Sequence, residues 1–434
     1  MSGVDWVSFS VAVFLFLVTY LGILTERLHR TVVALTGAVA MLALGRWLGF
    51  YTVDEAIGAI DFNTITLLMG MMIVVRVVKE TGSFEYLAIR ATKLAHGRPW
   101  LLMLYLGVVT SVLSMVLDNV TTIIILVPVT FSIADILSIS PIPFLMGEVI
   151  LSNIGGVATL IGDPPNVLIG SAAGFSFTDF LVHLAPIVLI VWAVTQGMLL
   201  LLYRRELLKS PANLDRLAEM DASKVVTDRR GAKRMLWVLG LTVVLYLIHD
   251  RIGLDPGLVA LLGACMALVW IRPKLEEVLG DIHWDVLLFF AALFIVVGGL
   301  DKAGVLGMLA NAVAGLTGHG MAIAALAIFW GGALMSAVVD NVPFTIAMLP
   351  VLAGLSARGL QIDALWWALA LGVGFGGNAT PVGATSNVIT ISMSERTPTP
   401  ISTRMWLRTG LTTTLVGCVL ASGLLFAAVE LGLL

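Results

Sequence analysis

Residues 113–129 read LSMVLDNVTTIIILVPV, an apolar stretch with Asp118 and Asn119 near its middle. A carboxylate inside a protein core or a bilayer is costly unless it is paired, protonated or bound to another group. The same arrangement returns at 336–351, where the chain reads SAVVDNVPFTIAMLPV. Two costly dipeptides in matching settings indicate that the chain keeps them for a function.

The composition is that of a polytopic membrane protein. Of 434 residues, 59% are hydrophobic and only 12% are charged, against about 25% charged residues in soluble domains. Apolar runs long enough to cross a bilayer recur along the chain, which predicts spanning helices. The net charge of −3 gives no sign of a nucleic-acid partner. The predicted spans lie near 7–25, 31–49, 62–79, 143–171, 180–202, 235–249, 256–271, 284–301, 364–393 and 406–429.

Three pairs of segments repeat at one spacing. The stretches quoted above match at an offset of 222 residues. Downstream, GGVATLIGDPPNV (155–167) matches GGNATPVGATSNV (376–388) at 221, and upstream FNTITLLMGMMIVV (62–75) matches WDVLLFFAALFIVV (284–297) at 222. The shared Asp, Asn, Gly, Thr and Pro residues make chance matches within an apolar alphabet unlikely. The chain therefore reads as a duplication.

The repeats define the domain organisation. We expect a first repeat at 1–205, a linker at 206–228 and a second repeat at 229–434. Each repeat carries a long apolar stretch interrupted by polar residues, which we interpret as a re-entrant hairpin, and a later span interrupted by Gly and Pro, which we interpret as a broken helix. The hairpins are expected at 99–139 and 321–357, and the broken helices at 143–171 and 364–393.

Charge sets the orientation. The basic segment 203–234 is expected to be a solvated linker, and the positive-inside rule places it in the cytoplasm. Alternating outward from it leaves only Arg46, Arg251, Lys302 and Arg358 of the 25 Lys and Arg outside. Both termini then lie outside, and the two repeats have opposite orientations. Inverted repeats with interrupted helices point to a secondary transporter with a central site.

Helix breaks in a membrane leave backbone groups that must be satisfied by protein, water or a solute. We expect unusual backbone geometry at the glycines and a stop in the helical hydrogen bonds at the prolines. The expected helix-break residues are Gly155, Gly156, Gly162, Pro164, Pro165, Gly376, Gly377, Pro381 and Gly383.

Asp118 and Asp340 are the carboxylates that the repeated motifs share, and both are candidates for proton coupling, since a membrane carboxylate can alternate between a proton and a cation. Helix capping is the plain alternative for each. For Asp163, which has Ala384 in its place in the second repeat, capping and function stay equally open. The candidate substrate- and ion-binding residues are Asp118, Asn119, Thr121, Thr122, Thr159, Asn166, Asp340, Asn341, Thr345, Thr380, Ser386 and Asn387.

Two further predictions concern the ends of the spans. The segments 84–98 and 305–316 read as amphipathic helices along the membrane surface. The six histidines lie near the ends of spans, so we interpret them as interfacial anchors: His29, His96, His183, His249, His283 and His319.

At LDNVTTIIILVPVT and NIGGVATLIGDPPNVLIG the chain resembles the ion transporter superfamily, and in particular the branch of arsenite efflux permeases and the melanosomal P protein. The resemblance covers essentially the whole length. It implies an all-α membrane protein of about ten spanning helices and two re-entrant hairpins. It also implies an elevator-type homodimer with fixed and mobile domains. Hairpin tips 118–122 and 340–345, with breaks 159–166 and 380–387, would form the site.

The resemblance favours efflux of arsenite or antimonite in exchange for protons, with sodium–proton antiport as the alternative. Sodium-coupled dicarboxylate carriers of the superfamily have Ser-Asn-Thr at the hairpin tips. The aspartates that stand here, with no cation in the motifs to offset them, disfavour a dicarboxylate or other anion carrier. A passive channel is a further alternative that the sequence does not exclude. An intramembrane aspartyl protease does not explain the duplication, and no Pro-Ala-Leu pattern accompanies the aspartates, so we expect no enzyme activity.

We expect no cofactor and no metal site, only a coupling ion, H⁺ or Na⁺. No GxxxxGK[ST] motif is present, so any ATP drive would need a separate ATPase subunit. The expected partners are a small inorganic solute, the coupling ion, the lipid bilayer and a second copy of the chain. The expected location is a prokaryotic cytoplasmic (inner) membrane.

Overall fold

The computed structural model describes residues 5–25, 27–208, 229–395, 397 and 400–434. Every regular element in these ranges is a helix. Most of the predicted linker, 209–228, lies outside the described residues. The parts of it that are described are helical, because α12 (Arg204–Leu207) and α14 (Arg229–Ile248) extend into the segment 203–234 from either side. Residues 229–234 of that segment thus belong to a helix long and apolar enough to span a membrane, and the linker at 206–228 stays a prediction.

The two halves carry the same order of helices. The first half consists, in chain order, of α1 (Trp6–Leu24), α2 (Arg30–Leu48), α3 (Val53–Gly58), α4 (Phe62–Glu80), α5 (Ser83–Leu94), α6 (Pro99–Ser114), α7 (Asn119–Leu137), α8 (Ile142–Gly156), α9 (Pro164–Ala173), α10 (Phe177–His183), α11 (Ala185–Leu202) and α12. In the second half α14 precedes α15 (Pro256–Ile271), α16 (Leu275–Gly280), α17 (Trp284–Lys302), α18 (Val305–Thr317), α19 (Met321–Val338), α20 (Asn341–Ser356), α21 (Asp363–Gly376), α22 (Thr385–Ser394), α23 (Thr403–Trp406) and α24 (Thr412–Glu430).

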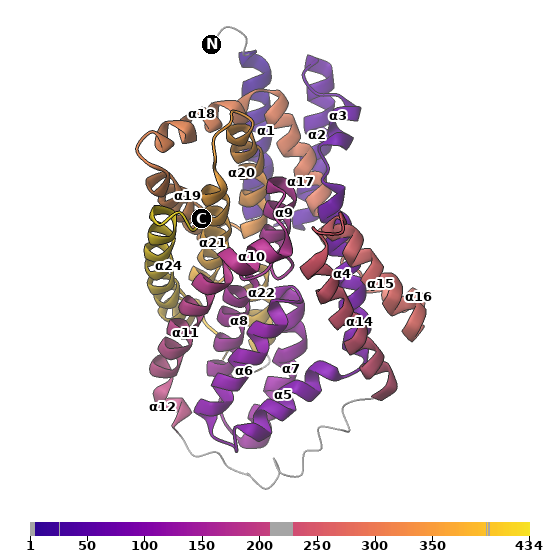
Figure 1. The fold of residues 1–434 in the computed structure, drawn as a ribbon, viewed down its shortest axis with the longest axis vertical. Helices are drawn as coiled ribbons and strands as arrows, with labels where there is room; N and C mark the ends of the chain where they lie inside the picture. The colour runs from indigo at the N-terminus through magenta and orange to yellow at the C-terminus, as the bar shows by residue number, and fades with distance from the viewer. Residues whose placement is uncertain (1–4, 26, 209–228, 396, 398–399) are drawn as a thin grey trace.

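The halves are inverted relative to each other. The hairpin α6–α7 enters the molecule from the lower end of Figure 1, and the hairpin α19–α20 enters from the upper end. Their connecting helices α5 and α18 lie across the long axis at these two ends. Among the described helices, nine are long and apolar enough to cross a membrane. The predicted class, an all-α membrane protein built from two inverted repeats with hairpins and broken helices, is confirmed.

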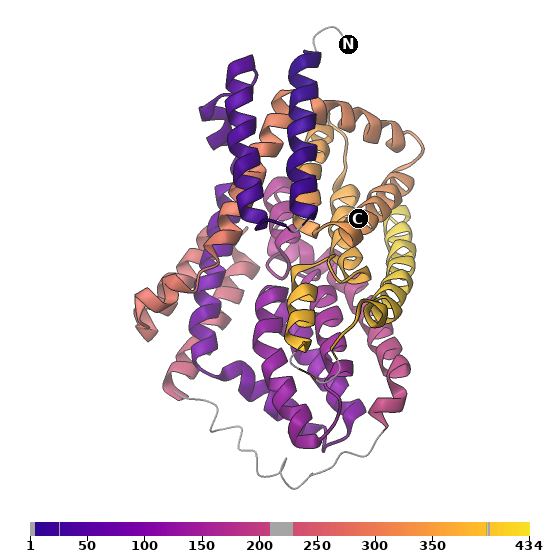
Figure 2. The ribbon, with the colours of Figure 1, turned by 180° about the vertical axis from the view of Figure 1, so that it is seen from behind.

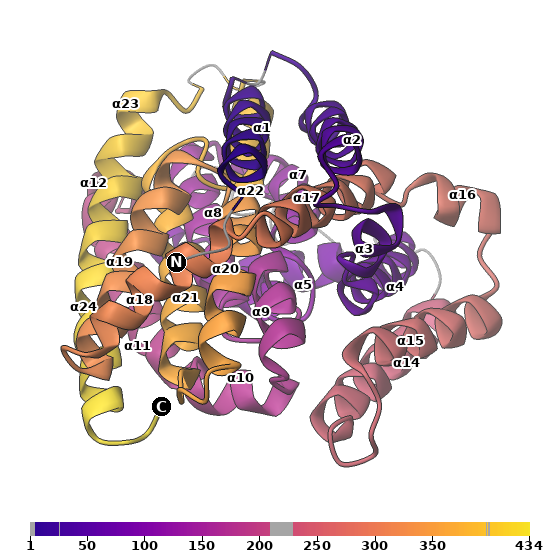
Figure 3. The ribbon, with the colours of Figure 1, turned by 90° about the horizontal axis from the view of Figure 1, so that it is seen from above.

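The helices form two groups. The helices α2, α4, α14 and α15 stand on one side, where α14 and α15 project away from the remainder (Figures 2 and 3). The two hairpins, the broken helices α8–α9 and α21–α22, and the long helices α11 and α24 make the other group. The helix α17 packs on α2 in the first group and also contacts α20 in the second. A site at the centre is therefore bounded by both groups.

Each hairpin is fastened to the broken helix of its own half by the same hydrogen bonds. Ser114 Oγ donates to the Ser152 carbonyl at 2.7 Å, and Ser336 Oγ donates to the Val373 carbonyl at 2.7 Å. Both hydroxyls are buried. Since the repeat offsets relate these two contacts, the duplication preserved the packing as well as the sequence.

The glycines at the breaks act through close packing. None of the six predicted break glycines has a positive φ. A Cβ on Gly155 would lie 2.9 Å from Ser111 Cα on α6, and a Cβ on Gly156 would lie 2.6 Å from the Gly162 carbonyl oxygen. Small residues let membrane helices approach closely. The expectation of unusual backbone geometry at these glycines was wrong, and close backbone contact is their role.

Gly155→Ala should destabilise the protein by about 1–3 kcal/mol, because the added methyl group meets backbone atoms of α6 that cannot rotate away. Gly147→Ala on the same helix is the matched control, since its Cβ would meet the flexible Met103 Cε at 3.1 Å. Thermal unfolding of both variants in detergent measures the difference. An unfolding temperature as high for Gly155→Ala as for the control would contradict the packing role.

Candidate functional site

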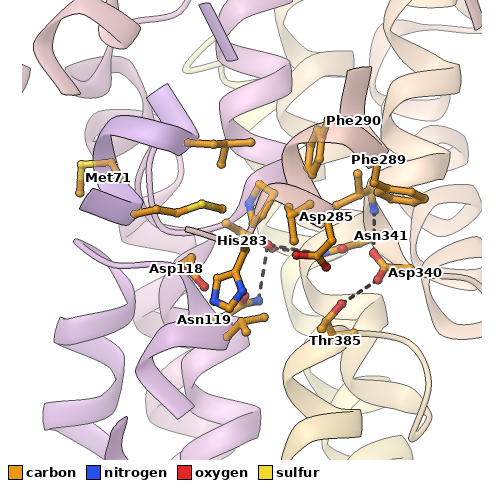
Figure 4. Close-up of a pocket in the computed structure, with 18 of the residues that line it drawn as sticks. Met71, Asp118, Asn119, His283, Asp285, Phe289, Phe290, Asp340, Asn341 and Thr385 are labelled. Carbon is orange, nitrogen blue, oxygen red and sulfur yellow. Dashed lines mark hydrogen bonds between the residues drawn. The ribbon is translucent and has the colours of Figure 1, made fainter. Parts of the chain in front are cut away.

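Both hairpin tips and both helix breaks converge on one cavity of about 220 Å³ (Figure 4). The tips contribute Asp118, Asn119, Asp340 and Asn341, and the breaks contribute Asp163, Pro164, Ala384 and Thr385. The opposite wall comes from α4 and α17. It is largely apolar, with Leu67, Leu68, Met71, Met72, Phe289 and Phe290. At its edge lie Asp285 of α17, His283 just before α17, and Arg30 at the start of α2. The cavity therefore lies between the two groups of helices.

Asp118 and Asp340 are the N-caps of the second helix of each hairpin. Asp118 accepts hydrogen bonds from the Thr121 amide at 2.8 Å and from the Thr121 hydroxyl. Asp340 accepts from the Val342 amide at 3.1 Å. Capping satisfies amides that a helix start inside the membrane would leave unpaired. Capping uses one oxygen of Asp340 and leaves the other to groups around the cavity, whereas Thr121 contacts both oxygens of Asp118. Both aspartates still line the cavity, so capping does not remove them from the site.

Asp163 is the carboxylate on which the two hairpins converge. It is buried, and Asn341 Nδ2 donates to its oxygens at 3.4 and 3.3 Å. Asn119 Nδ2 donates to it at 3.5 Å. The asparagines at the two tips are repeat equivalents, whereas Asp163 has no equivalent in the second half. One acidic group therefore joins both half-sites, and these long bonds hold it loosely.

Asn166 and Asn387 satisfy the breaks themselves. Asn166 Nδ2 donates to the carbonyls of Val157 and Thr159 at 3.0 and 2.8 Å. Asn387 Nδ2 donates to those of Gly377 and Thr380 at 2.8 and 3.0 Å. These amides pair carbonyl groups that the interrupted helices leave free. The structure therefore gives both asparagines a local task inside the protein, away from the cavity lining.

A buried amide, Asn153 on α8, connects the two halves. Its Oδ1 accepts from Asn119 Nδ2 at 3.0 Å and from Ser386 Oγ at 2.7 Å. Its Nδ2 donates to Asn378 Oδ1 at 2.7 Å and to Asn387 Oδ1 at 2.9 Å. Both donor and both acceptor positions of this amide are used. Asn153 thus holds one hairpin tip against the other half's broken helix.

The remaining predicted site residues are close by but do not line the cavity. Thr159 and Thr380 donate to the carbonyls of Met115 and Ala337, which fastens each break to its own hairpin tip. Thr345 donates to Asn341 O within α20, and the hydroxyl of Thr122 is buried without a partner among the described atoms. Of the predicted neutral groups, only Asn119 and Asn341 face the cavity.

Sequence reasoning missed Arg30, His283 and Asp285. Arg30 Nη1 lies 3.2 Å from Asp340 Oδ2 and donates to Thr385 Oγ1 at 2.9 Å. His283 was interpreted as an interfacial anchor, but it lines the cavity. Arg30 and Asp340 are 310 positions apart, and no local pattern joins them. The only signal for Arg30 in the sequence is its charge at the start of a span, and that charge was used to predict the orientation of the chain in the membrane.

Asn153→Asp should destabilise the protein by about 1–3 kcal/mol and lower its transport activity, because a carboxylate oxygen would face the Asn378 and Asn387 oxygens without a donor. The Asn119 and Ser386 contacts would survive. The measurement is the unfolding temperature in detergent beside solute flux in proteoliposomes. Asp250→Asn, at an exposed position, is the control for a change of the same size. Unchanged stability and flux in Asn153→Asp would contradict the role of this amide.

Comparison with known proteins assigns the family. Residues 20–372 match the family model described as "Citrate transporter" (CitMHS). A "46 kDa membrane protein" of Mycobacterium leprae is 40% identical over 417 residues, which cover 95% of this chain and 96% of that protein. An uncharacterized transporter of Mycobacterium tuberculosis is 42% identical over 418 residues, with the same coverage. The P protein of Homo sapiens is 31% identical over 94% of this chain, which spans 58% of the P protein.

A solved structure shows the same fold. The chain matches the crystal structure of the Alcanivorax borkumensis YdaH transporter with a TM-score of 0.61 at 18% identity, over 89% of both chains. The family match extends through both hairpins and α8–α9, and it ends within α21. The chain therefore belongs to the citrate transporter (CitMHS) family of the ion transporter superfamily, and it is a membrane transporter.

Proposed function

We propose that this protein is a secondary transporter that exchanges a monovalent cation, of which Na⁺ is the first candidate, for protons. The observation that carries the proposal is the charge around the central cavity. Four carboxylates line it, Asp118, Asp163, Asp285 and Asp340, and Arg30 is the one Lys or Arg among the described residues that do so. When the four acids are ionised, negative charge is in clear excess, and this favours a cation or protons.

The carboxylates and the amides suit exchange. Carboxylate and amide oxygens are ligands for hard cations. No group of three His, Cys, Asp or Glu residues in the described ranges could hold a metal ion as a cage. A cation would therefore be held by one or two carboxylates with neutral oxygens, and such a site can release it. Protons and the cation would compete for the same oxygens, and this competition couples their movements.

The same charge argues against a free polyanion. The family description names citrate, but a tricarboxylate in this cavity would meet several carboxylates and a single guanidinium, which is already paired with Asp340. Like charges at short range in a low-dielectric site repel strongly. A dicarboxylate carrier is disfavoured for the same reason.

Arsenite or antimonite efflux in exchange for protons is the second candidate. Its support is the size of the cavity: about 220 Å³ exceeds what one bare ion needs, since a water molecule occupies roughly 30 Å³ in the liquid. Neutral arsenite could accept hydrogen bonds from Asn119 and Asn341, while the aspartates exchange protons. The sequence placed this solute first. The additional acids, Asp163 and Asp285, reverse the order.

Asp118→Asn and Asp340→Asn should each reduce pH-driven Na⁺ flux to background in proteoliposomes, because an amide can neither ionise nor bind a proton in place of the cation. Asp255→Asn, exposed at the start of α15 and without a capping hydrogen bond, should transport like the parent protein. Na⁺ flux that persists in both hairpin variants would contradict the proposal.

The same vesicles should be tested with arsenite. Arsenite flux without Na⁺ flux, lost in the same two variants, would establish the second candidate. Flux of either solute that continues after the pH gradient is removed, and that never runs uphill, would instead indicate a passive channel.

A further inference from the structure

A second cavity of about 440 Å³, which we call the vestibule, adjoins the central one. It lies between Leu28 and His29, which come just before α2, and the tip of the second hairpin, and it also includes Val339 and Val388. Three residues line both this vestibule and the central cavity: Arg30, Asp340 and Thr385. They are therefore the partition between the two spaces.

The three side chains are joined to one another in a closed set of contacts. Arg30 Nη1 donates to Asp340 Oδ2 at 3.2 Å and to Thr385 Oγ1 at 2.9 Å. Thr385 Oγ1 donates to the same carboxylate oxygen at 2.9 Å (Figure 4). The guanidinium carbon of Arg30 lies 5.3 Å from the centre of the Phe289 ring, within the range of a cation–π contact. Arg30 is thus held from the α17 side while it pairs with the hairpin.

The partition exists at one of the two hairpin tips only. In the register set by the contacts of Thr31 with Asp285 and of Gly257 with Asn63, the repeat equivalents of Arg30 and Thr385 are Pro256 and Pro164. Neither proline can donate a side-chain hydrogen bond. Asp118, the equivalent of Asp340, accepts its hydrogen bonds from Thr121 of its own helix. Two inverted halves that were functionally alike would repeat the contact. The asymmetry assigns a specific task to the second hairpin.

We propose that Arg30, Asp340 and Thr385 form a gate between the vestibule and the central cavity, and that a monovalent cation arriving at Asp340 opens it by replacing Arg30 as the partner of that carboxylate. The closing contact crosses from α2, in one group of helices, to the second hairpin, in the other. Its loss therefore frees the hairpin tip from α2 as well as opening the path. The opening of the gate by a cation rests on the proposed function, cation transport.

The energetics suit a gate. Arg30 and Asp340 are only partly buried, and ion pairs that stay in contact with solvent are weak. A pair of that strength closes the path without locking it. An ion with comparable affinity for Asp340 can exchange with the guanidinium, whereas a deeply buried pair would resist exchange.

Two neighbouring positions on α22 provide matched reporters. Val388 lines the vestibule alone, and Ile389 lines the central cavity alone. The native Cys265 and Cys418 are first replaced by alanine. Val388→Cys and Ile389→Cys are then made separately in the full chain, and their reaction rates with a small charged thiol reagent are measured on the purified protein. Unchanged labelling at 388 shows that a gate variant is folded.

Labelling at 388 should be fast in every background, and labelling at 389 should be slow while the gate is intact. Arg30→Gln should raise the rate at 389 by roughly tenfold, as expected for loss of a charge-assisted hydrogen bond, and Thr385→Val should raise it by less. Arg30→Lys should retain most of the protection. Arg27→Gln, a neighbouring exposed arginine that lines neither space, should leave it unchanged. A rate at 389 that Arg30→Gln does not raise would overturn the gate.

Added Na⁺ tests the opening step. It should raise the rate at 389 with Asp340 present and have no effect in Asp340→Asn. A gate that responds to Arg30→Gln but not to Na⁺ would overturn the replacement of Arg30 by the cation. This labelling requires no transport, so it can succeed or fail independently of the Na⁺ flux on which the proposed function depends.

Discussion

Helices that are interrupted inside the membrane leave backbone polar groups that must find partners, and the polar contacts at the centre of this protein follow from that need. Four interruptions meet at the centre, and each brings its own solution. Asp118 and Asp340 cap the helices that begin at the hairpin tips, and Asn166 and Asn387 pair with carbonyls of the breaks. The glycines of the breaks let backbones approach closely enough for these contacts. Polar groups that the fold requires for its own integrity thus gather around one cavity, where a solute can use them.

The two halves are alike in their packing and unlike in their charges. The fastening of each hairpin to its broken helix is duplicated, as in the Ser114 and Ser336 contacts. Asp163, Asn153 and the Arg30–Asp340 pair are not duplicated. The duplication therefore provides the scaffold for two related half-sites, and single substitutions give each half a different task. We infer that the first half supplies the shared acid, and that the gate forms only at the second hairpin, where Arg30 of the first half meets Asp340 and Thr385.

The sequence predicted the fold well because its signals are local. Hydrophobic runs predicted most spans, and the repeat offsets aligned the hairpins and breaks in the two halves. The tip residues of the site could also be predicted, since an Asp-Asn pair inside an apolar stretch is costly wherever the chain folds. Arg30, His283 and Asp285 could not, because they reach the cavity through packing of helices distant in sequence. Asn153 lies in an apolar helix, where a single amide has no pattern around it. The glycines were misread because close packing and unusual φ angles demand the same residue.

Under the proposed function, protons and a cation compete for the carboxylates of one cavity. The most direct measurement is the apparent affinity of the purified protein for Na⁺ as a function of pH, read from the rise in unfolding temperature on adding Na⁺. Competition predicts that the affinity increases with pH, by up to about tenfold per pH unit for each proton displaced, and that Asp340→Asn reduces this slope. A Na⁺ affinity that does not change with pH would contradict the account.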